Sequence, residues 1–197
     1  MRTRCGLVFA FLCLAAAVAQ AAPPQCNESI GPGFATFCEG YYALCIKARC
    51  KPAAQGSNQA ECACAVEQGW SMGPEKCSDP GRNQTTPPAA NATLMSTYSN
   101  LFNTSEKTLT CAPDTRWAWC YGAPCRVDAK DPSKATCRCP VCTSAASTLG
   151  GDCKHVNCKE IWSAATPKND AFANNHYYKY LTGKGVQVPP AATACRQ

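Results

Sequence analysis

The chain has 197 residues, with 19 Lys plus Arg against 13 Asp plus Glu, and 18 cysteines. Its charges are scattered singly, which excludes the clustered basic stripe of a nucleic-acid-binding protein and the polybasic run of a protein that binds anionic lipid. Large aliphatic residues are too few for folding on apolar burial alone. These features predict a small disulfide-rich fold with little regular secondary structure.

Residues 1–21 predict a secretory signal peptide. Two arginines precede an apolar stretch over residues 6–18, and Ala19 and Ala21 suit the small-residue requirement of the cleavage site. The stretch is too short to span a membrane. Its removal takes away two arginines, so 17 basic residues face 13 acidic ones and the mature net charge is +4. We expect a secreted, extracellular protein, or a periplasmic or medium protein if the source is bacterial.

Two cysteines leave with the leader, and the remaining sixteen predict eight disulfides in an oxidising compartment. Five successive cysteines recur with the same spacing, four of them at a constant offset of 75 residues. The two series are Cys45, Cys50, Cys62, Cys64 and Cys77, then Cys120, Cys125, Cys137, Cys139 and Cys153. This repetition indicates an internal duplication.

The duplication predicts two tandem modules based on β-hairpins. We expect the first module over residues 22–77, a linker rich in Pro, Thr and Asn over 78–108, the second module over 109–158, and a tail over 159–197. In each module a turn-forming stretch separates two cysteines, Cys50 from Cys62 and Cys125 from Cys137, which places these cysteines on the arms of a hairpin. Within the linker, residues 94–102 are apolar enough to pack on a module.

The tail predicts one helix. Asn169 or Asp170 can cap its start and Gly183 can end it. Phe172, His176 and Tyr180, with Leu181 beside them, would share the face that packs on the neighbouring module.

The first module resembles the epidermal-growth-factor-like (EGF-like) family. It carries six cysteines from Cys38 to Cys77, with one residue between the fourth and the fifth, and Gly69-Trp70 matches the family's glycine-aromatic turn. The acidic calcium signature of the family is absent, and no cofactor is expected. The resemblance implies the pairs Cys38–Cys50, Cys45–Cys62 and Cys64–Cys77, and by repeat Cys111–Cys125, Cys120–Cys137 and Cys139–Cys153; Cys142–Cys158 and Cys26–Cys195 would then complete eight.

Two alternatives use the cysteines chemically. Cys139 and Cys142 form a Cys-x-x-Cys that suits a thiol-disulfide oxidoreductase, although the strand-to-helix context of that motif is missing. The dense cluster between Cys137 and Cys158 suits tetrahedral zinc, against which stands the oxidising compartment. Its members are Cys137, Cys139, Cys142, Cys153, His155 and Cys158. The sequence offers no convincing catalytic set.

Four sequons mark glycosylation acceptors if the source glycosylates its secreted proteins: Asn27, Asn83, Asn91 and Asn103. Aromatic residues must first cover the disulfides, so a core position is the leading interpretation for most of them. Trp117 and Tyr121 are candidates for a binding surface. Lys47 and Arg49 are the basic candidates.

The expected function is that of a secreted, non-enzymatic monomer that binds an extracellular protein or glycan, because rigid disulfide-closed loops lose little entropy on binding. The leading alternative is a double-headed serine-protease inhibitor. Residues 45–50 would offer Lys47 or Arg49 to a trypsin-like pocket, and residues 120–125 would offer Tyr121 to a chymotrypsin-like one.

Overall fold

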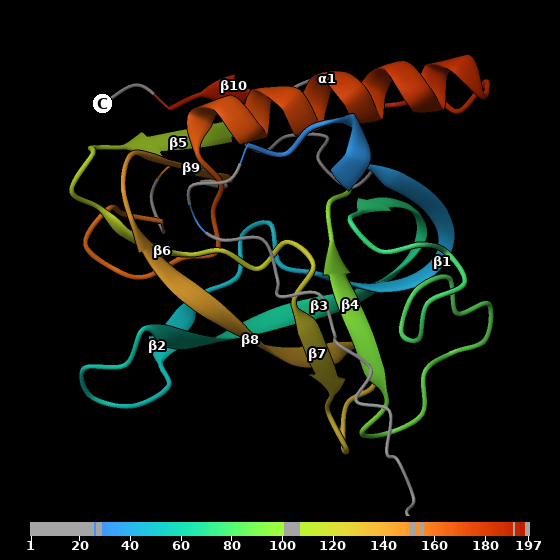
Figure 1. The fold of residues 1–197 in the computed structure, drawn as a ribbon, viewed down its shortest axis with the longest axis horizontal. Coiled ribbons are helices and arrows are strands. Elements are labelled where there is room, and N and C mark those ends of the chain that lie inside the picture. The colour runs from blue at the N-terminus through green and yellow to red at the C-terminus, as the bar shows by residue number, and fades with distance from the viewer. Residues whose placement is uncertain are drawn as a thin grey trace, which may run out of the picture.

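The computed structural model describes Cys26 and residues 29–100, 107–149, 153, 156–190 and 192–195. Crossing β-strands form the body of the molecule, and a single long helix lies across one end of it (Figure 1). The strands are β1 (Thr36–Leu44), β2 (Cys50–Pro52), β3 (Gln59–Gly73), β4 (Thr93–Thr97), β5 (Lys107–Cys111), β6 (Arg116–Ala118), β7 (Pro124–Val127), β8 (Lys134–Thr143), β9 (Ala146–Leu149) and β10 (Thr193–Ala194). The helix is α1 (Pro167–Gly183), and a 3₁₀ turn, η1 (Pro32–Phe34), precedes β1.

Seven strands form one sheet in the order β2-β3-β1-β4-β7-β8-β6. An additional pairing of β3 with β8 closes the path β3-β1-β4-β7-β8 into a ring. A smaller sheet has the order β10-β5-β9. The prediction of a small disulfide-rich fold built on hairpins is confirmed, with more extensive sheets than the sequence indicated.

The duplication is visible in the strand register. Cys50 lies opposite Cys62 in the β2–β3 hairpin, and Cys125 lies opposite Cys137 in the β7–β8 hairpin, 75 residues later. The β1–β3 pairing recurs in the same way as the β6–β8 pairing. Each repeat therefore contributes the same three-stranded unit.

The two repeats meet across an antiparallel β3–β8 pairing in which Cys62 faces its own equivalent, Cys137. A pairing that brings equivalent residues together is the signature of a two-fold relation. A pseudo-two-fold axis therefore passes between these two cysteines. The hydrogen bond from Val66 N to Ser133 O (2.8 Å) has its counterpart from Val141 N to Asn58 O (2.8 Å).

A fourth strand extends each repeat. In the first, β4 runs parallel to β1 with Ala43 opposite Ser96. In the second, an isolated bridge places Ser163 opposite Ala118 in the same parallel sense. Each of these segments also contacts the other repeat, since Ser96 N donates to Ala123 O and Ser163 N to Ala48 O, both at 2.8 Å. The repeats are thus interlocked, and the prediction of two modules joined by a flexible linker is wrong.

All sixteen cysteines outside the leader form disulfides, as predicted. The pairs are Cys26–Cys142, Cys38–Cys77, Cys45–Cys64, Cys50–Cys62, Cys111–Cys158, Cys120–Cys139, Cys125–Cys137 and Cys153–Cys195. Cys5 and Cys13 lie outside the described residues. None of the eight is a pair that the EGF-like resemblance implies, so that pairing is corrected.

The physical reason lies in the hairpins. Cys50 and Cys62 occupy directly opposed positions with their Cα atoms 4.1 Å apart, and so do Cys125 and Cys137. This separation suits a bond across the hairpin and leaves neither cysteine for a more distant partner. Spacing along the chain indicates how many cysteines a module holds, but register decides which of them meet.

The core on the axis consists of sulfur and small side chains. The Cys45 and Cys137 Sγ atoms are 3.3 Å apart although they belong to different disulfides. Two triplets of buried sulfurs form there, and the 75-residue offset converts one into the other: Cys45, Cys64 and Cys137, then Cys62, Cys120 and Cys139. Alanines repeat between them and are buried in both copies: Ala43, Ala48, Ala60, Ala118, Ala123 and Ala135.

The predicted helix is confirmed, but it begins earlier than the cap residues indicated. Thr166 is the N-cap and its hydroxyl accepts from Asn169 N, with Pro167 in the first turn. The fully packed stripe is displaced by one residue from the predicted face and consists of Asn169, Ala173, Tyr177 and Leu181. Tyr180 stacks on Phe37 of β1 at 3.8 Å between ring centroids. Among the described residues no helix is long and apolar enough to cross a membrane.

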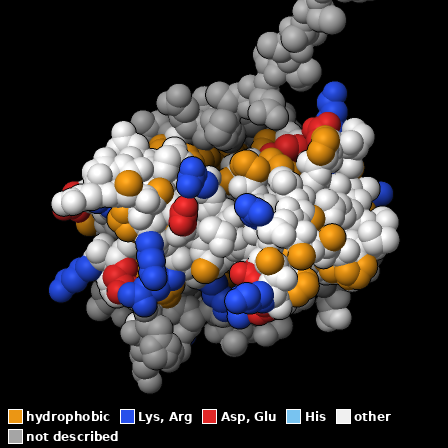
Figure 2. Space-filling view, turned by 90° about the horizontal axis from the view of Figure 1, so that it is seen from below, with side chains coloured by type: hydrophobic (Ala, Val, Ile, Leu, Met, Phe, Trp, Pro, Cys, Tyr) orange, Lys and Arg blue, Asp and Glu red, His pale blue; other side chains and the backbone are white. Residues whose placement is uncertain are grey.

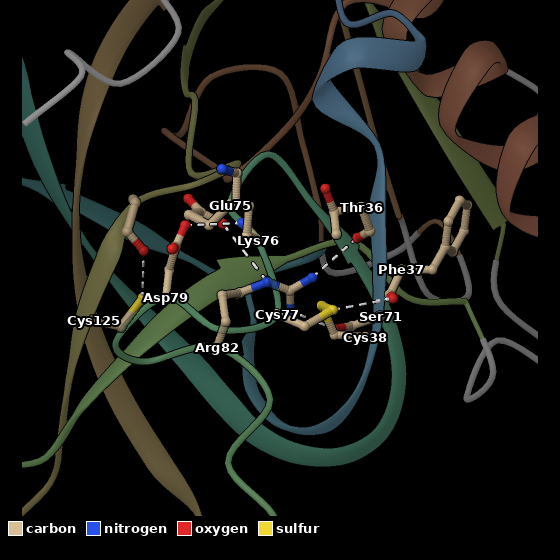
Figure 3. A network of polar contacts seen from close by, with 11 residues as sticks. Thr36, Phe37, Cys38, Ser71, Glu75, Lys76, Cys77, Asp79, Arg82 and Cys125 are labelled. Carbon is tan, nitrogen blue, oxygen red and sulfur yellow. Dashed lines mark hydrogen bonds and ion pairs between the residues drawn. A yellow bond between two sulfur atoms is a disulfide. The ribbon is translucent and has the colours of Figure 1, made fainter.

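The segment between β3 and β4 was predicted to be extended or mobile, but it is anchored by a buried arginine (Figure 3). Arg82 donates to the Ser71 hydroxyl (2.9 Å) and to the Thr36 carbonyl (3.1 Å), and its Nε lies 3.8 Å from the Glu75 carboxylate. Burial lowers the pKa of Arg82 and raises that of Glu75, while each group partly offsets the shift of the other. The expectation that residues 94–102 pack is met at Leu94, which is fully buried.

Candidate binding pocket on the pseudo-two-fold axis

A cavity of about 70 Å³ lies where the pseudo-two-fold axis reaches helix α1. Both repeats supply its floor. Cys45 and Cys120, two equivalent cysteines whose disulfides belong to the axial cluster, stand on either side. The remaining equivalent positions of the floor are Ile46 and Tyr121, Ser96 and Ser163, and Thr97 and Ala164. The strands that carry them are held by the interlocked fourth segments, so the floor is rigid.

The roof of the pocket has no counterpart under the pseudo-symmetry. Asn169, Asp170 and Ala173 of α1 form one part of it, and Ile30 and the strand β9 form the rest. The Asn169 side chain accepts from Ile30 N at 3.1 Å, which ties the segment before β1 to the helix. Backbone hydrogen bonds between Ser147 and Ala165, 2.7 and 3.0 Å long, attach β9 to the chain that enters α1.

The pocket wall is mainly apolar but holds two buried polar atoms that have no hydrogen-bond partner among the described residues. They are the Oγ1 atom of Thr97 and the indole Nε1 of Trp119. A buried N–H or hydroxyl without a partner costs on the order of 1–3 kcal/mol, so such atoms are rare in a folded protein. Both belong to residues that line the same cavity, which is the arrangement that a bound polar group would satisfy.

Asp170 adds the one carboxyl group of the described lining. Burial raises its pKa to about 6, against the opposing effect of a hydrogen bond from the Asn174 side chain. The Asn174 Nδ2 atom lies 3.3 Å from Asp170 Oδ1, and Asn174 Oδ1 accepts from the Tyr98 hydroxyl at 2.6 Å. Burial also raises the pKa of Tyr98, so the phenol stays protonated and acts as the donor. This chain orients the carboxyl group at the rim.

The pocket lacks the parts of a hydrolytic site. Its described lining holds no histidine, lysine or arginine, and both of its cysteines are in disulfides. The Thr148 hydroxyl donates to the carbonyls of Ser163 (2.8 Å) and Ile46 (3.2 Å), so it is held as a donor rather than activated as a nucleophile. A polar cavity with one carboxyl group and no base beside a hydroxyl is suited to binding.

The residues predicted to bind lie in different surroundings. Trp117 has only 1% of its surface exposed and donates to the Ser144 hydroxyl, so its assignment to a binding surface is wrong and the core interpretation holds. Tyr121 is half-buried and lines the pocket. Lys47 is exposed, and Arg49 forms an ion pair with Glu160 away from the pocket.

The chemical alternatives for the cysteines find no free thiols. Cys139 and Cys142 pair with Cys120 and Cys26, not with each other. The five cysteines of the predicted zinc cluster go to five different partners. Oxidised sulfurs offer no thiolate for a metal or for exchange chemistry. His155 lies outside the described residues.

The two segments predicted as inhibitor loops do not protrude. Arg49 O accepts from Ala63 N, and Cys50 N donates to Ile161 O, so the first segment is paired on both sides. In the second, Gly122 N donates to Ser96 O at 2.8 Å. Backbone that is already paired in this way is not free to dock into a protease cleft.

Of the predicted glycosylation acceptors, Asn27 and Asn103 lie outside the described residues. Asn91 is exposed, and its side chain accepts from Arg126 Nε at 3.0 Å. Asn83 is half-buried beside Arg82. Use of these sites stays a prediction.

Comparison of the chain with protein-family models, with curated proteins and with solved structures finds no match. The pocket was not found from the sequence because its residues come from eight separate segments. One signal was present: the 75-residue offset identifies Cys45 with Cys120 and Ile46 with Tyr121, and residues beside an axis of duplication are natural candidates for a shared site.

Proposed function

We propose that this chain is a secreted, non-enzymatic binding protein that holds a small, mainly apolar molecule with a hydroxyl group in the pocket beneath α1. The observation that carries the proposal is the presence of two partnerless buried polar atoms, on Thr97 and Trp119, in the wall of one apolar cavity. The eight disulfides and the lack of a membrane-spanning helix among the described residues are consistent with an extracellular protein.

The hydroxyl group follows from the polar atoms on offer. The Trp119 indole can only donate, so the ligand must supply an acceptor, while the Asp170 carboxylate requires a donor. A hydroxyl group provides both, whereas an ether or a hydrocarbon does not. In size, a cavity of about 70 Å³ holds about five water-sized groups, so a larger molecule would leave part of itself outside the opening.

A binding measurement with small probes tests this function. Cyclohexanol, phenol and benzyl alcohol, with methylcyclohexane as the probe without a hydroxyl, are titrated into ¹⁵N-labelled protein. We expect the alcohols to shift the Trp119 indole N–H resonance, because that group has no competing partner. The hydrocarbon should bind more weakly, since it leaves the same polar atoms unsatisfied.

Two variants on the same helix provide the control. Ala173→Leu places a larger side chain in the cavity wall, whereas Ala171→Leu adds the same carbon atoms at an exposed position. Both residue types favour a helix. Alcohol binding should fall at least tenfold in Ala173→Leu and stay unchanged in Ala171→Leu. Equal binding by both variants, or no alcohol binding by the natural protein, would overturn the proposal.

A further inference from the structure

A second concave surface lies away from the pocket, on the outer side of β2. This groove has a volume of about 610 Å³ and runs between β2, the turn that joins β5 to β6, and the segment 158–161. Disulfides brace all three walls: Cys50–Cys62 holds β2 to β3, and Cys111–Cys158 joins the other two. The groove is therefore part of the rigid body of the fold.

The pseudo-symmetry explains why the groove is open. In the equivalent place on the other repeat, Val127 N donates to Ala92 O (2.9 Å) and Asn91 N donates to Val127 O (3.1 Å), so the chain lies against β7. Pro52 stands at the position equivalent to Val127, 75 residues earlier. Proline has no N–H to donate, so this pairing cannot be repeated beside β2. Pairing reaches only Cys50 N, which donates to Ile161 O at 3.0 Å.

The walls of the groove carry four basic side chains against two acidic ones: Arg49, Lys51, Arg116 and Lys159, with Asp114 and Glu160. Arg49 and Glu160 neutralise each other in an ion pair. Lys51, Arg116 and Lys159 form no ion pair with any residue that the structure describes, and Asp114 alone opposes them. The groove has a local excess of two positive charges, half of the mature net charge of +4.

The lower face of the molecule shows how unusual such an excess is on this protein. Lysine and arginine side chains there stand in small groups with acidic side chains among them, and they form no continuous basic field (Figure 2). A local cluster in a concave surface concentrates its field where solvent is partly excluded. This favours an anionic ligand that follows the groove rather than a broad polyanion that covers the face.

The backbone of β2 decides against a peptide that would add to the sheet as a strand. Lys51 is paired with Glu61 of β3, so its N–H points inward. Of the two outward positions, Cys50 N is already bonded and Pro52 has no N–H. Recognition in the groove must therefore come from side-chain charges, which suits a chain of acidic sugars.

We propose that the groove between β2 and the segment 158–161 binds an acidic glycan through its carboxylate or sulfate groups. Lys51, Arg116 and Lys159 hold these groups, while Pro52 and Ile161 contact the sugar rings. This site is separate from the pocket beneath α1, so one can fail without the other.

The test is calorimetric titration of the secreted protein with a heparin hexasaccharide and a galacturonate hexamer at 50 and 200 mM NaCl, with maltohexaose as the neutral glycan and hexaglutamate as the acidic peptide. At least one acidic glycan should bind, more weakly at the higher salt concentration. No binding of either acidic glycan at 50 mM NaCl would overturn the proposal, and so would tighter binding of hexaglutamate or equal binding of maltohexaose.

Two triple variants of equal charge separate the groove from the general field. Lys51→Ala/Arg116→Ala/Lys159→Ala removes the three groove cations, and Arg126→Ala/Lys130→Ala/Lys179→Ala removes three exposed cations elsewhere, Arg126 being the equivalent of Lys51. We expect at least a tenfold loss of glycan binding in the first and less than a threefold loss in the second. Equal losses would show attraction to net charge alone and contradict the groove. Alcohol binding by the first variant should stay unchanged.

Discussion

The duplicated core and the segments that only one repeat possesses differ in how strictly they are specified. In the core, cysteines and alanines recur at matching positions and the strand registers repeat without a shift. Outside it, equivalent positions differ in kind: Ile46 matches Tyr121, and Pro52 matches Val127. The core needs small side chains because two layers of disulfides meet on the axis. The unmatched segments are free of that constraint, and both candidate binding surfaces depend on them.

The comparison also shows how a duplicated fold acquires an asymmetric site. The floor of the pocket is nearly two-fold, but α1, β9 and Ile30 cover it from one side only. The groove exists because one proline interrupts a pairing that the other repeat completes. A repeated body and a few unmatched residues are sufficient to make two different surfaces.

The largest expected effect concerns an unmatched anchor. Arg82→Met should lower the free energy of unfolding by about 3–5 kcal/mol, because it leaves the partly buried Glu75 carboxylate without its cation. Urea unfolding followed by tryptophan fluorescence measures the change. Arg126→Met, at an exposed arginine, should change it by less than about 0.5 kcal/mol. A loss below about 1 kcal/mol in Arg82→Met would show that the segment between β3 and β4 is anchored elsewhere.

Next in size is a direct test of the equivalence of the repeats. Removal of Cys45–Cys64 by paired serine substitutions should cost about 3 kcal/mol, as expected for a bond that closes a loop of this length. Removal of Cys120–Cys139, which has the same sequence separation of 19 residues, should cost the same within about 1 kcal/mol. Chemical unfolding of both variants measures the difference. A large inequality would mean that one repeat carries the stability of the core.

Asp170 should make stability depend on pH in a definite direction. Its pKa in the folded chain is about 6, above its ordinary value of 3.8, so the unfolded chain ionises first. The carboxyl group therefore favours folding below pH 3.8, and this contribution is lost as the pH rises to about 6. Asp170→Asn should raise stability at pH 8 by no more than about 3 kcal/mol and leave it unchanged at pH 3.5. Thermal unfolding at the two pH values decides; an equal shift at both would contradict the assignment.

The smallest effect lies at the start of α1. Thr166→Ala removes the hydroxyl that accepts from Asn169 N and should cost about 1 kcal/mol. Thr182→Ala, which removes an exposed hydroxyl bonded to the Tyr178 carbonyl, should cost less. Helix unfolding measured by hydrogen exchange distinguishes the two. If both variants lose the same amount, the cap does not set the position of the roof.

Some features could be predicted because they depend on neighbours in sequence. The hairpins around Cys50–Cys62 and Cys125–Cys137 follow from turn-forming residues between cysteines, and α1 follows from a capped, Gly-terminated segment. The position of the cap was wrong by three or four residues because Pro167, compatible with the first helical turn, allowed the helix to begin at Thr166's side of it. Trp117 was considered for the surface because composition does not reveal which aromatic residues are buried.

The sequence by itself determined the duplication, the number of disulfides and the hairpin arms, since each of these is a matter of local spacing and composition. Only the tertiary structure decided which cysteines pair, that β4 joins the two repeats, and where a pocket and a groove form. The physical reason is that these features depend on strand register and on contacts between residues far apart in the chain: Cys62 faces Cys137 across the axis, and Ile30 meets Asn169 over the pocket.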